Sequence, residues 1–120
     1  MNFIKGRLAS TGEGLSFLAG DRRLSLSAYQ FATAPSAGQE VVLGVRPEHF
    51  EIASNGTWPG FKVDIVEPMG ADTVIWCSDP AGSVQVRTTG SRRAARGESL
   101  TLHVDPAQVS LFSAETGERL

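Results

Sequence analysis

The sequence predicts an all-β fold, and three observations support that prediction. Short runs in which apolar and polar residues alternate recur along the 120 residues, and this two-residue period is typical of half-buried strands. The 13 glycines and 6 prolines are spread along the chain and divide it into short segments. No window of ten residues has a convincing 3.6-residue apolar period, so we expect little or no helix. Short strands separated by turns indicate a sandwich or a small barrel.

In the first half of the chain, each predicted strand is an alternating or apolar run that stops at a turn. A turn at residues 12–14 closes the first strand, and a turn at residues 20–21 separates the next two, which should form a hairpin. A loop over residues 28–38 precedes an apolar run, which Pro47 should end because proline has no amide donor. The predicted strands are residues 3–9, 15–18, 23–26, 41–45 and 50–53.

The second half repeats the pattern after a strong turn at residues 54–57, where the Asn-Gly pair tolerates positive φ angles. We place the junction between two small lobes near residues 54–60. Asp105 is expected to begin a turn or one short helical turn as its N-cap. The predicted strands are residues 61–65, 73–77, 84–87, 100–104 and 109–112.

The phase of these strands selects the side chains that should form the core, because every second residue faces the same side of a sheet. Cys77 is expected to be a buried free thiol. The predicted core residues are Phe3, Leu24, Leu43, Val45, Phe61, Val63, Ile65, Ile75, Val84, Val86, Leu100, Leu102 and Phe112.

Composition excludes several classes of protein. The net charge of -2 and the isoelectric point near 5.6 lack the basic footprint that nucleic-acid binding needs. A single cysteine cannot form an internal disulfide. Residues 1–10 do not look like a signal peptide, and no stretch approaches the ~20 apolar residues of a membrane span. We therefore expect an intracellular soluble protein.

No catalytic pattern is present in the sequence. The phosphate-binding pattern GxxxxGK[ST] and the nucleophile pattern GxSxG are both missing. His49 and His103 are far apart, and neither has a second ligand at a metal-binding spacing. We therefore expect no enzyme, no bound metal and no cofactor in this chain.

The densest polar group is Arg46-Pro47-Glu48-His49, directly after an apolar strand. In an extended chain, Arg46 and Glu48 would point to the same side. They could form a structural ion pair or contact a partner, and composition does not separate these readings. The ion pair within the chain is the stronger of the two, because a strand that ends at Arg-Pro-Glu already has a structural use.

A second polar group is the arginine cluster Arg92, Arg93 and Arg96, which could hold an anionic partner. A solvated loop is the better interpretation, since the net charge is negative and no aromatic residues interleave the arginines.

Four segments in order along the whole chain resemble one known family. They are MNFIKG at residues 1–6, GVRPEH at 44–49, VEPMGADT at 66–73 and LFSAETGERL at 111–120. Together they are similar to the C-terminal TOBE (transport-associated OB) domain of ABC sugar-importer ATPases of the maltose and glycerol-3-phosphate importer type. Ser113 departs from the family, which often has Asp there, and this affects only a terminal contact.

The resemblance implies a non-catalytic regulatory and dimerisation domain with two intertwined OB-like lobes. It implies that ATP and Mg belong to an ATPase domain outside these residues, and that the parent protein is a homodimer. It also implies that the partners are transporter membrane subunits and a regulatory protein, and not a nucleic acid. The implied location is the cytoplasmic side of the inner membrane. The matching residues that would form an interface or a structural motif are Arg46, Pro47, Glu48, His49, Glu67 and Gly70.

A second function stays open. TOBE-type modules also occur as stand-alone binders of small ligands or oxyanions, which need converging donors or basic side chains. Candidates for that role are Arg46, Arg87 and the arginine cluster.

Overall fold

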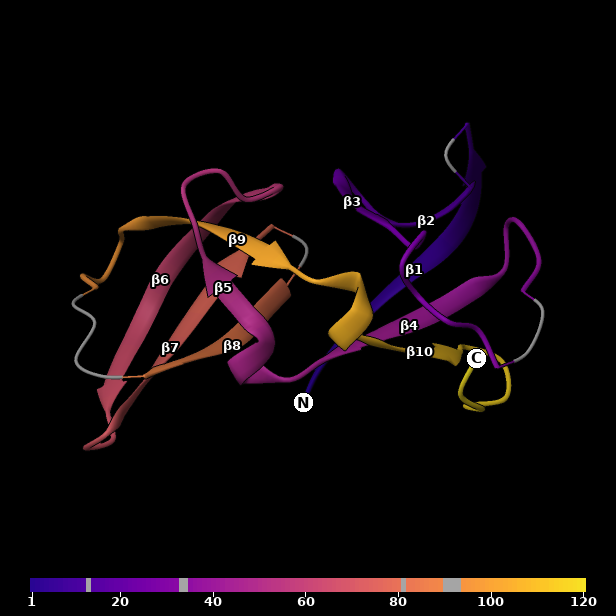
Figure 1. The fold of residues 1–120 in the computed structure, drawn as a ribbon. Coiled ribbons are helices and arrows are strands. Elements are labelled where there is room, and N and C mark those ends of the chain that lie inside the picture. Colours follow the sequence, from indigo (N-terminus) through magenta and orange to yellow (C-terminus); the bar gives the residue numbers. More distant parts are fainter. Residues whose placement is uncertain (13, 33–34, 81, 90–93) are drawn as a thin grey trace. The chain divides into compact units, whose positions relative to one another are not determined.

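The computed structural model describes residues 1–12, 14–32, 35–80, 82–89 and 94–120, and within them it is nearly all β (Figure 1). This confirms the predicted fold class. Two single 3-10 turns, η1 (Pro47–His49) and η2 (Pro106–Gln108), accompany the strands. The strands are β1 (Asn2–Thr11), β2 (Gly14–Ala19), β3 (Arg22–Ser25), β4 (Glu40–Val45), β5 (Phe50–Ile52), β6 (Trp58–Pro68), β7 (Asp72–Asp79), β8 (Gly82–Thr89), β9 (Ser99–Val104) and β10 (Ser110–Ser113).

The chain folds into two compact units, and the second is inserted into the first. Unit 1 comprises Met1–Val45 and Asp105–Leu120, and unit 2 comprises Arg46–Val104. The predicted junction near residues 54–60 is therefore misplaced. The Asn-Gly turn lies inside unit 2, where Gly56 packs against the main chain of Leu102 and Trp58 is 1% exposed. A strong turn marks a chain reversal, and here that reversal joins two strands of one unit.

Unit 1 is an antiparallel sheet in the order β10-β4-β1-β2-β3. The predicted hairpin is present as β2 and β3, and β4 ends two residues before Pro47 as expected. Asp105 starts η2 in the predicted manner, since its carboxylate accepts a hydrogen bond from the amide of Ala107 at 2.9 Å. The core of this unit contains Leu8, Phe17, Leu24, Leu26, Val41, Leu43, Val45, Val109, Leu111 and Leu120.

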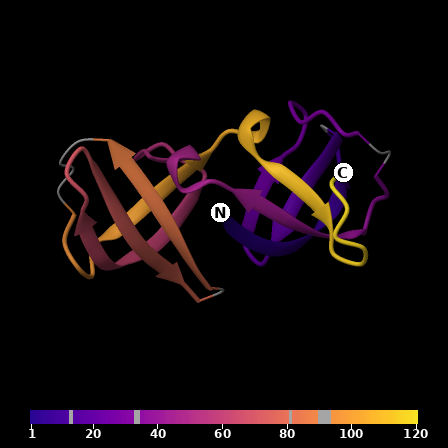
Figure 2. The same cartoon turned by 90° about the horizontal axis from the view of Figure 1, so that it is seen from below.

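Unit 2 is an antiparallel sheet in the order β5-β9-β6-β7-β8. Its two outer strands, β5 and β8, approach each other, so the sheet curls into a nearly closed barrel (Figure 2). Closure reduces the unpaired edges that an open sheet would present. The barrel interior holds Phe50, Trp58, Phe61, Val63, Val74, Ile75, Cys77, Val84, Val86, Leu100, Leu102 and Val104.

Two predicted core residues are exposed, each because the strand phase differs from the prediction. Phe3 is 65% exposed, because the odd-numbered positions 3, 5 and 7 of β1 face solvent while Leu8 is buried. Ile65 is 54% exposed, because a register shift between Val63 and Ile65 moves Ile65 to the outer face. Phe112 is half-buried, with its ring edge-on to Phe3 at 6.3 Å between centroids.

Candidate functional site

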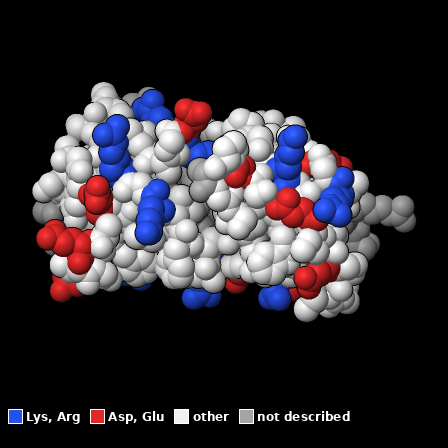
Figure 3. Space-filling model, turned by 180° about the vertical axis from the view of Figure 1, so that it is seen from behind, with Lys and Arg blue, Asp and Glu red and all other residues white. Residues whose placement is uncertain are grey.

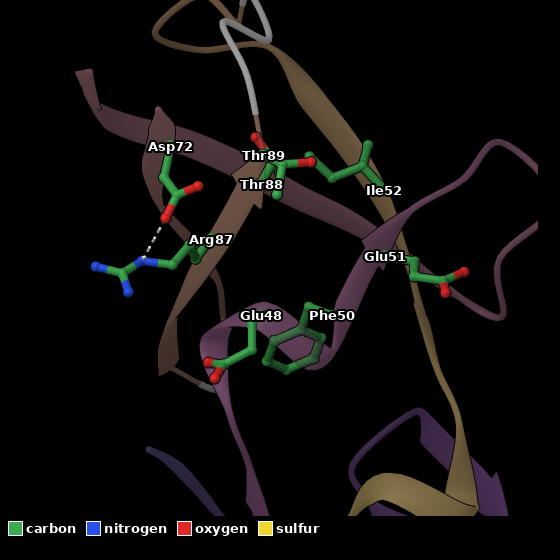
Figure 4. Close-up of a pocket in the computed structure, with 8 residues that line it drawn as sticks. All are labelled: Glu48, Phe50, Glu51, Ile52, Asp72, Arg87, Thr88 and Thr89. Carbon is green, nitrogen blue, oxygen red and sulfur yellow. Dashed lines mark ion pairs between the residues drawn. The ribbon is translucent and has the colours of Figure 1, made fainter. Parts of the chain in front are cut away.

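A polar pocket lies on unit 2, where η1 and β5 face the start of β7 and the end of β8 (Figure 4). Its volume is about 520 Å³, and it is open to solvent. Among the residues that the structure describes, the lining consists of Glu48, Phe50, Glu51, Ile52, Asp72, Arg87, Thr88 and Thr89.

Pro47 fixes the local geometry on the η1 side of the pocket. Arg46 is extended, with φ -69° and ψ 145°, and Pro47 begins the turn at a position where its missing amide proton costs nothing. The amide of His49 donates to the carbonyl of Arg46 at 2.9 Å, which closes the turn. Arg46 and Glu48 therefore do not lie in one extended strand, and the expectation that they share a face by strand phase is wrong.

The predicted ion pair between Arg46 and Glu48 is also not found. Both side chains are exposed, and neither makes a hydrogen bond or ion pair within the described ranges. Glu48 instead reaches the rim of the pocket beside Phe50, as Figure 4 shows.

The opposite wall of the pocket carries one long ion pair. The Nε atom of Arg87 lies 3.8 Å from Oδ2 of Asp72, and these side chains are 47% and 34% exposed. A pair this long and this exposed contributes little to stability, about 0–1 kcal/mol at most. Asp72 and Arg87 are therefore available to a ligand at small cost.

Phe50 and the hydroxyl of Thr88 are the enclosed parts of the lining residues. Phe50 is 2% exposed and packs near Trp58, with 6.4 Å between ring centroids. The hydroxyl oxygen of Thr88 is buried and has no hydrogen-bond partner within the part of the chain that the structure describes. A buried polar atom without a partner is uncommon and calls for an explanation.

The other predicted site residues lie away from this pocket's lining. Glu67 is exposed near the end of β6, and Gly70, with φ +84°, forms the turn that leads into β7. In that turn the amide of Met69 donates to the carbonyl of Asp72 at 2.7 Å. Arg96 is exposed before β9.

Arg92 and Arg93 lie outside the described residues, so the structure does not test the arginine cluster. Among the described residues no group of three or more His, Cys, Asp or Glu side chains could hold a metal ion. No helix in those same ranges is long and apolar enough to cross a membrane.

Sequence reasoning selected Glu48 and Arg87 but missed the other residues that line the pocket. Asp72 belongs to the segment VEPMGADT, of which only Glu67 and Gly70 were predicted site residues. Two of the four family-like segments thus meet at one pocket. No local sequence pattern marked Phe50, Thr88 or Thr89 as site residues. Only the pairing of β7 with β8 and the curl of the sheet bring the end of β8 close to η1.

Two small β units, one of them bearing a shallow polar pocket, define the class as an OB-like β module. A family model described as the TOBE domain matches residues 43–112, and one described as the MalK OB fold domain matches residues 1–50. The chain belongs to the TOBE domain family. The two matched models describe an OB fold domain and a TOBE domain, which confirms the reading of the chain as a module distinct from an ATPase domain.

The sequences of curated relatives align with nearly the whole length of this chain. The chain is 32% identical over 117 residues to the sulfoquinovosyl glycerol transport ATP-binding protein SmoE of Agrobacterium fabrum, covering 97% of this chain and 32% of SmoE. It is 33% identical over 122 residues to the sn-glycerol-3-phosphate import ATP-binding protein UgpC of Salmonella paratyphi A, covering 100% of this chain and 33% of UgpC. The chain therefore spans about a third of the length of these relatives.

One solved structure has the same fold with little sequence similarity. The cytoplasmic molybdate-binding protein ModG, solved with molybdate bound, superposes with a TM-score of 0.69 at 18% identity. The match covers 92% of this chain and 94% of ModG. At this identity the likeness establishes the fold alone.

Proposed function

We propose that this chain is the regulatory and dimerisation domain of the ATP-binding subunit of an ABC importer for sugars or related solutes. The observation that carries the proposal is the match of a TOBE domain model together with relatives that are transport ATP-binding proteins along the full length of this chain. In this proposal, ATP and Mg bind to an ATPase domain elsewhere in the parent protein. The parent works beside membrane subunits on the cytoplasmic side of the inner membrane.

Exposed apolar side chains support a role in protein contacts. On unit 1, Met1 and Phe3 are 52% and 65% exposed, and Phe112 lies beside Phe3. On unit 2, Ile65 and Trp76 are cross-strand partners that are 54% and 38% exposed. Adjacent large apolar side chains on a surface typically mark an interaction site.

The charge distribution supports a protein partner over a nucleic acid. On the face shown in Figure 3, Lys and Arg side chains are interspersed with Asp and Glu side chains. Nucleic-acid binding calls for a basic stripe, whereas mixed charges suit the polar rim of a protein contact.

Sedimentation of the 120-residue chain over a hundredfold range of concentration tests the dimer. We expect a monomer–dimer equilibrium that Phe3→Ser or Trp76→Ser shifts toward the monomer, depending on which apolar surface is used. A monomer at all concentrations, for the chain and for the chain joined to its ATPase domain, would contradict the dimerisation role. The importer role would be contradicted if the coding sequence upstream of these residues encodes no ATPase domain.

A second candidate function is a small-ligand or oxyanion-binding module, and the fold likeness to ModG favours its being tested. The test is calorimetric titration of the chain with molybdate and with sulfate. Micromolar binding of either anion would favour this second function, whereas no heat at millimolar anion would favour the regulatory one.

A further inference from the structure

The outer face of the unit 1 sheet is an apolar surface with a basic border. The register of β1, β4 and β10 places Lys5 opposite Val42 and Val42 opposite Phe112, and Phe112 in turn pairs with Arg119. Residues directly opposite each other in antiparallel strands point to the same face of the sheet. These four side chains therefore form one row across the outer face.

Two further apolar side chains lie beside this row. Phe3 and Met1 are exposed, and the ring of Phe3 lies edge-on to that of Phe112. Gly44 makes room for them, because a Cβ atom there would lie 2.8 Å from Sδ of Met1 and 3.1 Å from Cε2 of Phe112. Large apolar side chains gathered on a surface in this way typically mark an interaction site.

The charged side chains of this face are mostly basic. Lys5, Arg7 and Arg119 are exposed, and the carboxylate that the register places among them is that of Glu40, which lies opposite Arg7. None of these four side chains makes a hydrogen bond or ion pair within the described ranges. Three cations against one carboxylate give the described part of the face a formal charge of +2. Two copies of this face would therefore repel each other.

The outer face of unit 2 carries a second apolar pair, and a bulge creates it. Ile65 lies opposite Trp76 because the register of β6 shifts between Val63 and Ile65. Both side chains of the pair are exposed. Bulges re-aim side chains and are features of a fold rather than defects. The shift takes an isoleucine out of the barrel interior and sets it beside an exposed tryptophan.

Carboxylates predominate beside the apolar pair of unit 2. Asp64 and Glu67 flank Ile65 along β6, and both are exposed. Lys62 is the exposed cation of the same strand. The border that β6 supplies therefore has a formal charge of -1. The ion pair between β7 and β8 adds no net charge to it.

We propose that the outer face of unit 1 in one copy of this chain docks on the outer face of unit 2 in a second copy. The proposal rests on the dimerisation role proposed above and names the two surfaces that form the contact. Charge decides the pairing, because a basic border meets an acidic one only when the two different faces meet. The apolar side chains form the centre of the contact and the charged ones its rim, as is usual for protein interfaces.

The test is sedimentation of charge-reversed chains, alone and mixed. One variant, Lys5→Glu with Arg7→Glu, makes the unit 1 face acidic, and the other, Asp64→Lys with Glu67→Lys, makes the unit 2 face basic. Each variant alone brings like charges together, so we expect its dissociation constant for self-association to rise about tenfold or more. An equimolar mixture should associate about as tightly as the parent chain, because each reversed face then meets its complement.

The two variants together separate this pairing from a contact of like faces. A contact between two unit 1 faces, or between two unit 2 faces, would respond to reversal of that face only, and either result would overturn the proposal. Exchange of an apolar side chain has the same logic, since Phe3→Ser and Trp76→Ser should both weaken self-association.

Failure of this pairing can be told apart from failure of the dimerisation role. A chain that dimerises and is weakened by neither charge-reversed variant would overturn the pairing and leave the role intact. A parent chain that stays monomeric by itself would also overturn the pairing. The dimerisation role fails only if the chain joined to its ATPase domain is monomeric as well.

The matched control is Asp21→Lys with Glu51→Lys, which changes the net charge as much as Asp64→Lys with Glu67→Lys does. Asp21 lies in the turn between β2 and β3 and Glu51 lies in β5, and both are exposed outside the two faces. The control should associate as the parent chain does, and dispersed NMR spectra will establish that each variant is folded. If the control loses self-association to the same extent, the effect is one of net charge and the proposed pairing is wrong.

Discussion

The hydroxyl of Tyr29 donates a hydrogen bond of 2.7 Å to the main-chain oxygen of Leu120, 91 positions away in the sequence. The same hydroxyl accepts a hydrogen bond of 3.2 Å from the amide of Leu111 in β10. Phe31 packs edge-on against the Tyr29 ring, with 4.7 Å between centroids. One side chain of the loop between β3 and β4 thus ties down the C-terminal segment of unit 1.

Removal of that hydroxyl should destabilise unit 1. Tyr29→Phe keeps the ring and its contact with Phe31 but leaves the amide of Leu111 and the oxygen of Leu120 without this partner. We expect the free energy of unfolding to fall by about 1–2 kcal/mol, measured by urea denaturation. The matched change Phe31→Leu keeps both hydrogen bonds and should cost less. An unchanged midpoint for Tyr29→Phe would mean that water replaces the hydroxyl fully.

Gly6 is required by a close approach inside unit 1. A Cβ atom at this position would overlap the carbonyl oxygen of Leu18 and the ring of Phe17, which is fully buried. Gly6→Ala should therefore lower the free energy of unfolding by about 1–3 kcal/mol, the range for overpacked cores. Gly12→Ala is the control, since a Cβ there meets nothing within 4 Å. Similar melting temperatures for Gly6→Ala and Gly12→Ala would show that β2 moves away at little cost.

The buried hydroxyl of Thr88 should lower the free energy of unfolding. Thr88→Val keeps the shape of the side chain and removes the buried hydroxyl that has no partner among the described residues. We expect the variant to be more stable by about 1 kcal/mol, whereas most substitutions destabilise. Thr89→Val, at an exposed neighbouring position, should change stability by less than about 0.5 kcal/mol. A destabilised Thr88→Val would indicate that the hydroxyl is satisfied in solution.

The sequence allowed most strands of this fold to be predicted, because an alternating apolar pattern directly reflects one buried face. Leu100 and Leu102 lie in β9 with the phase expected, and both are buried. The lobe junction was missed because a turn shows only where the chain reverses. It does not show whether the two strands that it joins belong to the same core. Val45 and Arg46 are consecutive residues of one polar–apolar boundary, yet they belong to different units.

The candidate site could be predicted only in part, for a related reason. Glu48 stood out because Arg-Pro-Glu-His is a dense polar group after an apolar strand. Its neighbours Asp72 and Thr88 come from strands 24 and 40 positions later, and the arrangement of those strands in the sheet decides their proximity. Long-range pairing of this kind leaves no mark in the local pattern of either strand.

The irregularity in β6 gives a direct test of strand phase. Val63 pairs with Cys77 and is 2% exposed, while Ile65 pairs with Trp76 across the register shift and is 54% exposed. Val63→Ala should therefore cost about 2 kcal/mol through lost burial and a cavity. Ile65→Ala should cost less than about 0.5 kcal/mol. Equal losses for the two variants, measured by thermal unfolding, would indicate a regular strand with Ile65 inside.

Cys77 should make the stability of unit 2 depend on alkaline pH. Burial raises the pKa of its thiol to about 11 from an ordinary value of 9.0, with smaller contributions from the negative charges of Asp64 and Asp79. Between these two pH values the unfolded chain loses the thiol proton while the folded chain keeps it. Folding therefore becomes less favourable as pH rises from 9 to 11, and the loss levels off above 11.

A difference of two pKa units corresponds to a total loss of about 2–3 kcal/mol. The measurement is urea denaturation at pH 8, 9, 10 and 11, with Cys77→Ala as the matched variant, because lysines and Tyr29 also titrate in this range. The alanine variant will have a constant cost from its lost sulfur, but its stability should fall less steeply with pH than that of the parent chain. Parallel pH profiles for the two proteins would show that the thiol is ionised as easily in the folded state as in the unfolded one.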